Sequence, residues 1–327
     1  MERRAFLGFA ATAAALPGVA RMARAQAYPA RPITMIVPFP AGGPTDTVAR
    51  ILAEPMRIWL GQPVIVENVT GAGGTLGAGR VARAAPDGYT LSVGNWNSHV
   101  ANGATYALQY DVVADFEPVA LLSSAPLWIV ARKSMPAANL QELIAWLKAN
   151  PDKATAATVG IGTAAHLCGL YLEDQTGARF QFVPYRGGAP AYQDLISGQI
   201  DLMCADTSAT ASQVRSGNIK AYAVMSKTRW TDAPDIPTVD EAGLPGLYVS
   251  FWQGLWAPKG TSKDIIARLN TAVMKAFADP AIRQRLVGLG QEIPQLDQQT
   301  PEQLRAFQRA EIEKWWPIIK TAGIKGE

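Results

Sequence analysis

Short apolar runs and segments with helical spacing alternate along most of the chain. Residues 48–60 carry apolar side chains every three to four positions, which places them on one face of a helix that Pro55 is expected to kink. Short, mostly apolar runs bounded by turn residues are typical of strands, and their alternation with helices predicts an α/β fold with mostly parallel sheets. The expected strands are Ile33–Val37, Val64–Glu67, Tyr89–Val93, Leu127–Ala131, Thr155–Val159, Phe180–Val183, Ile200–Cys204 and Ile219–Val224.

The chain changes character at about Thr261, after which only helices are expected. The pattern predicts helices near Asp264–Ala278, Pro280–Val287 and Pro301–Ala322, the last with Thr300 as its cap. Helices without strands are unusual for an independent domain of this size, so we expect this segment to pack back on the first domain.

The first residues have the features of an export signal. Arg3-Arg4 precede an apolar run, Ala5–Val19, and Ala25-Gln26-Ala27 follows as a cleavage site. The apolar run is shorter than the roughly 20 residues that span a bilayer. We therefore expect residues 1–27 to be removed after Ala27 in a periplasmic protein. The Arg-Arg-x-Phe-Leu order fits a twin-arginine signal, and a general secretory signal stays equally open.

The signal also carries the excess charge of the chain. The whole sequence has a net charge of +3, and residues 1–27 contain four Arg and one Glu, so the remainder is neutral. No basic stripe with interleaved aromatic residues is visible, so nucleic acid is not an expected partner. About 300 residues remain, which is enough for two domains with full cores.

The positions of the two cysteines favour buried free thiols over a disulfide. Export permits a disulfide, but Cys168 falls in an expected helix and Cys204 in an expected strand, so we predict two buried free thiols. His99 and His166 are the only histidines, and no metal-ligand spacing occurs. We expect neither a metal nor a cofactor.

The turn after the first expected strand is the strongest candidate binding element. Gly42 and Gly43 allow close approach of a ligand to the backbone, and Thr45 or Asp46 can cap the following helix. Free backbone N–H groups at a helix start form an anion site without a charged side chain, although a plain strand–helix turn is the alternative. The candidate ligand-binding residues here are Phe39, Ala41, Gly42, Gly43, Thr45 and Asp46.

Two further glycine-bearing turns repeat this arrangement. One spans Gly160–His166, with Gly162, Thr163 and His166 as candidates, and the other is Tyr185-Arg186-Gly187-Gly188, with Tyr185 as a candidate. Such turns lie at the carboxyl ends of strands, where open α/β folds bind ligands. If the three turns face one crevice, they form a cage for carboxylate oxygens.

Three more candidates follow strand ends. Asp206 ends an apolar run and could accept a hydrogen bond from a ligand amine or hydroxyl, or cap a helix; both interpretations stay open. Trp96 and Trp252 could line a ligand pocket or pack in the core.

Nucleotide and enzyme signatures are weak by comparison. Gly71–Gly77 lacks the strict dinucleotide fingerprint, and no nucleophile elbow exists. His166 in a first helical turn is more often a packing residue than a base.

Several motifs follow one another in a fixed order and spacing. They are Tyr28-Pro29-x-Arg31-Pro32-Ile33, Val37-Pro38-Phe39-Pro40-Ala41-Gly42-Gly43-x-Thr45-Asp46, Leu60-Gly61-Gln62-Pro63-Val64, Ala85-Pro86-Asp87-Gly88-Tyr89-Thr90-Leu91, Val183-Pro184-Tyr185-Arg186-Gly187-Gly188-Ala189-Pro190 and Pro237-Thr238-Val239-Asp240-Glu241-Ala242-Gly243. In this respect the chain resembles the Bug-type solute-binding receptors of tripartite tricarboxylate transporters.

The resemblance implies a two-domain Venus-flytrap fold with crossovers near Ser124–Leu127 and Ser250–Gly254. The implied domains are 28–125 plus 253–327, and 126–252. The implied ligand is a small aliphatic or aromatic carboxylate, held between the loops Phe39–Asp46 and Gly160–His166. Where a permease of the tripartite tricarboxylate type exists, the receptor, expected to be a monomer, delivers the ligand to it.

Some positions depart from the family pattern. Ile161 and Ala165 stand where the family favours small or hydroxylic residues, and with Trp96 an apolar Ile161 would suit an aromatic or larger apolar acid. Two other functions stay open: a sensor subunit that presents ligand to a membrane receptor, and a periplasmic enzyme using His166 or Asp206.

Overall fold

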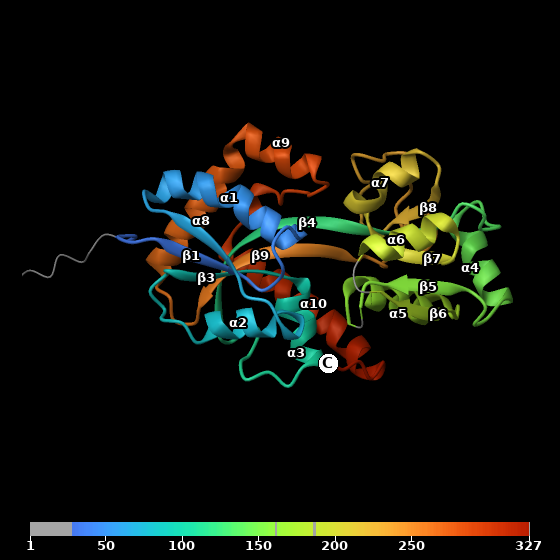
Figure 1. Cartoon of the computed structure of the whole chain (residues 1–327), viewed down its shortest axis with the longest axis horizontal. Coiled ribbons are helices and arrows are strands. Elements are labelled where there is room, and N and C mark those ends of the chain that lie inside the picture. The colour runs from blue at the N-terminus through green and yellow to red at the C-terminus, as the bar shows by residue number, and fades with distance from the viewer. Residues whose placement is uncertain (1–27, 161, 186–187, 327) are drawn as a thin grey trace, which may run out of the picture.

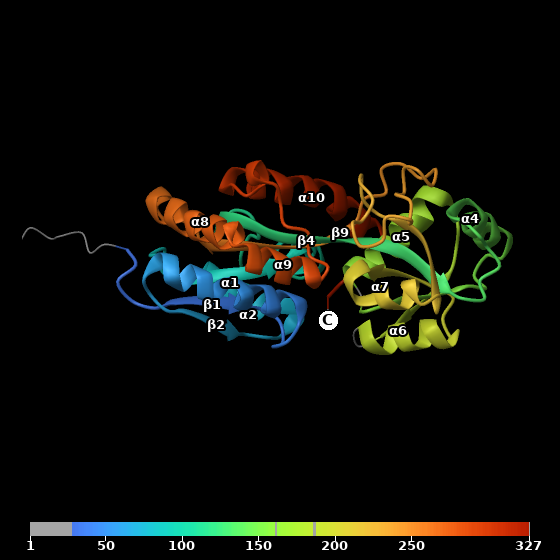
Figure 2. The same ribbon diagram turned by 90° about the horizontal axis from the view of Figure 1, so that it is seen from above.

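The computed structural model describes residues 28–160, 162–185 and 188–326. Two lobes lie side by side and are joined by two long strands, β4 (Phe116–Arg132) and β9 (Ser250–Pro258), which run across the middle of the molecule (Figures 1 and 2). No helix in the described part of the chain combines the length and apolar character needed to cross a membrane.

The first lobe is a five-stranded sheet with helices on both faces. Its parallel strands are β1 (Ile33–Val37), β2 (Val64–Asn68) and β3 (Thr90–Asn95), and β9 and β4 complete it in antiparallel pairing. Apolar side chains of α1 (Pro44–Leu60), α8 (Lys263–Ala278) and α9 (Pro280–Gly288) cover one face. Those of α2 (Thr75–Ala82) and α10 (Pro301–Thr321) cover the other, where the short α3 (Asn102–Thr105) also lies beside α10.

The second lobe continues the same sheet. β5 (Thr155–Thr158) pairs in parallel with β6 (Gln181–Pro184) and β7 (Leu202–Asp206), while β7 and β8 (Ile219–Val224) pair antiparallel with β4. Helices α4 (Leu140–Ala149) and α5 (Ala164–Thr176) pack on one face, and α6 (Gly188–Ser197) and α7 (Thr207–Arg215) on the other.

β4 changes partners along its length. Residues Phe116–Pro126 pair with β9, and from Leu127 onward the strand pairs with β7 and β8. The sheet order is β2-β1-β3-β9-β4-β7-β5-β6, with β8 also on β4. Both lobes therefore share one continuous backbone ladder through the crossing strands.

The predicted elements agree with this architecture to a large extent. All eight expected strands are present, and the three C-terminal helices lie within one or two residues of the expected bounds. The strand–helix–strand units are parallel as predicted, but β4 and β9 are antiparallel to their neighbours, so the sheet is mixed. The prediction missed β9 and the first half of β4, because glutamine, serine, proline and glycine interrupt their apolar pattern. Helix α1 continues through Pro55 to Leu60.

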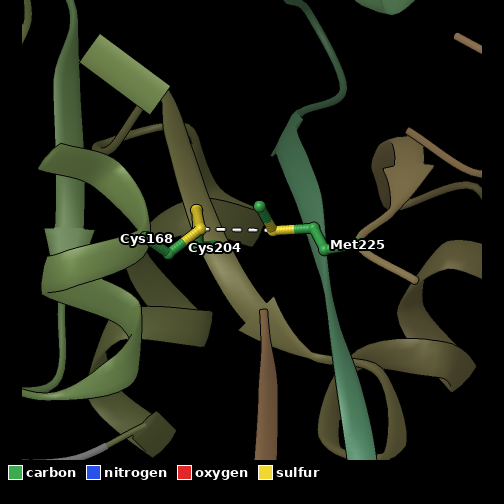
Figure 3. Close-up of a disulfide and its surroundings, with 3 residues drawn as sticks. All are labelled: Cys168, Cys204 and Met225. Atoms are coloured by element: carbon green, nitrogen blue, oxygen red, sulfur yellow. Dashed lines mark hydrogen bonds between the residues drawn. A yellow bond between two sulfur atoms is a disulfide. The ribbon is translucent and has the colours of Figure 1, made fainter. Parts of the chain in front are cut away.

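The prediction of two free thiols is wrong. Cys168 of α5 and Cys204 of β7 form a disulfide, with the Cα atoms 6.2 Å apart (Figure 3). Met225 Sδ lies 3.2 Å from Cys168 Sγ, and since a disulfide sulfur has no hydrogen to donate, this is a sulfur–sulfur packing contact. Helix and strand assignments do not exclude a bridge, because α5 packs directly on β7 and brings the two Cβ atoms together.

Candidate binding cleft

A cavity of about 640 Å³ lies where the two lobes meet the crossing strands. Its wall combines the starts of several helices with a large share of apolar side chains. From the first lobe come Phe39, Pro40, Gly43, Pro44, Thr45, Asn95, Trp96 and Asn97; from the second Val159, Thr163, Ala164, Ala165, Gly188, Tyr192, Met203, Cys204, Asp206 and Ala209; and from the crossing strands Leu127 and Phe251.

Asp46 fixes the shape of the turn between β1 and α1. Its Oδ2 accepts hydrogen bonds from the backbone N–H of Gly42 (2.8 Å) and from Nε of Arg50 (2.9 Å), and its Oδ1 accepts one from Nδ2 of Asn68 (2.9 Å). Burial raises the pKa of Asp46, but these three donors together outweigh it and hold the pKa below its usual value. Asp46 and Gly42 are not among the residues that line the cavity; they support the turn beside it, and the exposed Ala41 does not line the cavity either.

The start of α1 presents backbone to the cavity. Gly43 is the N-cap, Pro44 occupies the first helical position, and no side chain caps the helix. The first-turn amides that follow have no partner within the helix, and the dipole of this helix adds partial positive charge there. Thr45 is held in place by Nδ2 of Asn95, which donates to its Oγ1 (3.1 Å).

The start of α5 faces the same space from the second lobe. Thr163 is the N-cap, but its hydroxyl donates backward to the carbonyl of Gly160 (2.8 Å) and no side chain caps the helix. Nδ1 of His166 accepts the backbone N–H of Gly162 (3.1 Å), and the ring packs edge-on against Phe182. Burial lowers the pKa of His166, so it is neutral at pH 7 and serves as a support for this loop.

The end of β3 is braced by the glycine-rich turn that follows β2. Oδ1 of Asn95 accepts the backbone N–H groups of Asn97 and Ser98, and Nδ2 of Asn97 donates to the carbonyl of Gly73 (3.0 Å). A Cβ at Gly74 would contact the ring of Phe39 at 3.3 Å. The glycines near residue 73 thus allow this turn to pack directly beneath the cavity wall.

The tryptophans divide between wall and core. Trp96 lines the cavity and packs edge-on against Trp315 of α10, with ring centroids 5.4 Å apart. Trp252 is fully buried, and its indole N–H donates to Glu311 (3.2 Å), so it lies in the core behind the cavity. Tyr185 also lies outside the cavity, because its hydroxyl donates to Asp194 of α6 (2.6 Å).

The structure thus brings together six of the predicted residues from both lobes in the cavity wall. They are Phe39, Gly43, Thr45, Trp96, Thr163 and Asp206, whereas Ala41, Gly42, Asp46, Gly162, His166, Tyr185 and Trp252 lie around it. Ile161 and Arg186 lie outside the described residues. The sequence analysis missed several wall residues, among them Asn95, Asn97 and Tyr192. The two asparagines are polar residues beside Trp96 at the end of a strand, which is a signal that could have identified them. Tyr192 lies one helical turn after Gly188, so helical spacing could have identified it.

Comparison with known proteins decides the family. The model described as Tripartite tricarboxylate transporter family receptor matches residues 48–324. The chain belongs to this family. Solved structures similar to this chain extend over about nine tenths of it. The periplasmic binding protein BugD is 44% identical over 92% of this chain and 100% of its own, with a TM-score of 0.75.

Two other similar structures contain ligands. MatC from Rhodopseudomonas palustris, with bound malate, is 41% identical over 89% of this chain and 100% of its own, with a TM-score of 0.77. An R. palustris protein with adipate is 31% identical over 91% of this chain and 99% of its own, also with a TM-score of 0.77. This tripartite tricarboxylate receptor therefore has the predicted two-domain α/β fold of periplasmic binding proteins, and the resemblance to Bug-type receptors is confirmed.

Proposed function

We propose that this receptor captures a small carboxylate in the cleft between its lobes and delivers it to a permease of the tripartite tricarboxylate type. The observation that carries the proposal is the pair of uncapped helix starts, α1 and α5, that border one cavity from opposite lobes. Backbone amides at helix starts bind carboxylate oxygens, and their dipoles favour negative charge. The malate and adipate bound by two relatives are dicarboxylates, which agrees with this chemistry.

The apolar part of the wall bears on the size of the ligand. Leu127, Met203 and Phe251 lie in the same cavity as the helix starts, and 640 Å³ exceeds what a four-carbon acid requires. This supports aliphatic or aromatic acids with an apolar body. In this proposal the ligand is bound and released unchanged. His166 accepts the backbone N–H of Gly162 and Asp46 that of Gly42, so each is engaged within its own loop.

Capture is proposed to involve closure of two domains, 28–125 with 253–327 and 126–252. The change of partner of β4 between Pro126 and Leu127 supports a boundary there. The proposal also includes export to the periplasm with cleavage after Ala27, in a segment outside the described residues, and action as a monomer. The Cys168–Cys204 disulfide agrees with an oxidising compartment.

A thermal-shift screen of residues 28–327 tests the proposal. Aliphatic and aromatic acids should raise the melting temperature, and their amide or ester analogues should not, since a ligand that binds only the native state stabilises it by mass action. The variant Gly43→Val is the site control. Gly43 has extended backbone angles (φ −74°, ψ 168°), and an added Cβ would approach only the carbonyl of Pro40 at 3.3 Å.

We therefore expect Gly43→Val to fold normally and to lose about 100-fold or more in affinity, because an overfilled site costs on the order of 3 kcal/mol. Titration calorimetry with the best acid of the screen measures this loss. Wild-type affinity in this variant would show that the start of α1 is not part of the binding site. Equal melting shifts with acids and neutral analogues would overturn carboxylate capture itself.

A further inference from the structure

Asp206 introduces a negative charge into a cavity whose other features attract anions. It lies at the carboxyl end of β7, and it is the only acidic residue among the described residues that line the cavity. Among the described residues in that part of the wall, Tyr192 is the other titratable group, and its pKa is raised by burial and by the nearby Asp206.

The carboxylate of Asp206 is not used to cap the helix that follows. Asp206 is the N-cap of α7, a position where an acidic side chain normally accepts a first-turn N–H, yet it makes no capping bond. The two threonine hydroxyls nearby donate to carbonyl oxygens, so they do not cap the helix either. Thr210 Oγ1 donates to the carbonyl of Asp206 (2.8 Å), and Thr207 Oγ1 donates to the carbonyl of Pro126 (3.0 Å). Of the two roles that the sequence leaves open for Asp206, the cavity role is the one that the structure favours.

Ligand entry changes the surroundings of this carboxylate. While the cavity is open, water can hydrate it, and a bound ligand displaces that water. A carboxylate left without water or a donor in an apolar cavity is strongly unfavourable, and a second carboxylate placed beside it adds repulsion. A ligand that carries a cationic donor at that position removes both costs. The apolar side chains of Leu127, Met203 and Phe251 surround the rest of such a ligand.

We propose that Asp206 makes this receptor selective for zwitterionic carboxylates, in which the carboxylate is bound by the helix starts and an ammonium group pairs with Asp206. The inference rests on the proposed carboxylate capture and adds the class of acid. Plain diacids are then weaker ligands of this chain.

The test compares ligands that differ only in the amine. Suitable pairs are phenylalanine with 3-phenylpropionate, leucine with 4-methylpentanoate, and aspartate with succinate, each titrated at pH 7.5 into wild type, Asp206→Asn and Asp232→Asn. Asp232 is exposed in the second lobe, so Asp232→Asn makes the same charge change away from the cavity. At least one amino acid should bind wild type about tenfold or more tightly than its deamino partner, since hydrogen bonds to charged groups are the strong ones.

Asp206→Asn should remove that preference and leave the deamino acid bound as well as before or better, while Asp232→Asn should behave as wild type. A pH series adds a readout that a structural role would not change. Burial raises the pKa of Asp206 to about 6, so the affinity of wild type for the amino acid should fall as the pH is lowered through 6, and Asp206→Asn should not show this fall. Tyr192 beside Asp206 and His166 on α5, outside the cavity wall, are present in both proteins.

The outcomes separate this inference from the proposal on which it rests. Tighter binding of the deamino acid by wild type, or an equal loss for both members of a pair in Asp206→Asn, overturns the inference and leaves carboxylate capture intact. If neither member of any pair, nor any other acid, binds wild type, carboxylate capture fails and the inference fails with it.

Discussion

Two aspartates at helix starts show how local partners decide the role of a side chain. Asp46 is surrounded by donors from Gly42, Arg50 and Asn68, so it is ionised and works as a brace for the β1–α1 turn. Asp206 is the N-cap of α7, but it makes no capping hydrogen bond, and it lines the cavity. The residue type is the same and both lie at helix starts, but hydrogen-bond donors make Asp46 a support, whereas Asp206 is a candidate ligand contact.

His99 gives the folded state a pH dependence. It is fully buried, stacks on Trp256 with centroids 3.8 Å apart, and its Nδ1 lies 2.9 Å from Ser98 Oγ. Burial lowers its pKa from 6.5 to about 3. Between these two values the imidazole of His99 is protonated in the unfolded chain but not in the folded chain. The stability present above pH 6.5 is therefore lost as the pH falls towards 3.

We expect the free energy of unfolding to carry a term from His99 of up to about 1.4 kcal/mol per pH unit below pH 6.5. His99→Asn keeps a polar atom near the Nδ1 position and does not titrate, so its stability should depend less steeply on pH. Urea denaturation at pH 4 to 8 measures both slopes, with His166→Asn as the matched control for the second histidine. Parallel curves for wild type and His99→Asn would contradict the prediction.

At the residue scale the sequence predicted the loops better than the side chains that line the cavity. The glycine-bearing turns could be predicted because glycine, and the change from a strand pattern to a helix pattern, are local features of the sequence. Which side chain points inward depends on partners distant in sequence. Asp46 turns away because Asn68 lies on a neighbouring strand, and Trp252 turns away because Glu311 lies on α10.

Among the elements, the two crossing strands were the hardest to predict. The sequence Ser250–Pro258 has a glutamine, a glycine and two tryptophans, and its apolar pattern follows neither a helix nor an alternating strand. Both of its faces are buried, with α10 on one side and α1 and α8 on the other, so no alternation is required. The other strands were found because their β-branched and apolar runs are bounded by turns.

The disulfide joins a helix to a strand in the second lobe. It links α5, whose start faces the cavity, to β7, and Cys204 itself lines the cavity. The bridge closes a loop with a sequence separation of 36. Cys168→Ser/Cys204→Ser should therefore lower the free energy of unfolding by about 2–4 kcal/mol, mainly because the unfolded chain gains freedom.

Denaturation of wild type with and without a phosphine reductant provides the control. The reduced wild type should match the double variant, and the variant should not respond to the reductant. If reduction leaves the wild-type denaturation curve unchanged although mass spectrometry shows the bridge open, the stabilising role is refuted.

At the scale of the whole molecule, one contact between the two lobes is made by Gly290 and Ser208. Gly290, just beyond α9 of the first lobe, lies so close to Ser208 of α7 that an added Cβ would come within 2.2 Å of the Ser208 Cβ and 2.8 Å of its Cα. Gly290 has φ +70°, and Gly217 at the far end of α7 has φ +68°, where an added Cβ would have no other atom within 4 Å. Both glycines therefore have a left-handed backbone conformation, and only Gly290 lies against another residue, Ser208.

Gly290→Ala should hold the lobes apart and weaken binding of the best acid by about tenfold, because closure then becomes less favourable. Gly217→Ala should show the cost of the left-handed backbone alone, about 1–2 kcal/mol of stability, with affinity unchanged. Calorimetry reports the affinities, and small-angle scattering should give a larger radius of gyration for Gly290→Ala alone. Equal affinity and equal size in the two variants would show that this contact does not limit closure.

The position of β9 in the sheet also fixes the order in which the protein can be completed during synthesis. β9 lies between β3 and β4, yet it is made more than a hundred residues after both of them. At about 5–20 residues per second this leaves roughly 6–25 s in which the first lobe has an open seam. The second lobe has no such gap, because its remaining strands follow one another directly between residues 155 and 224. A nascent chain that stops before residue 250 therefore holds a nearly complete second lobe beside a first lobe with the inner edge of β3 unpaired, and such an edge is a template for aggregation and a target for quality control.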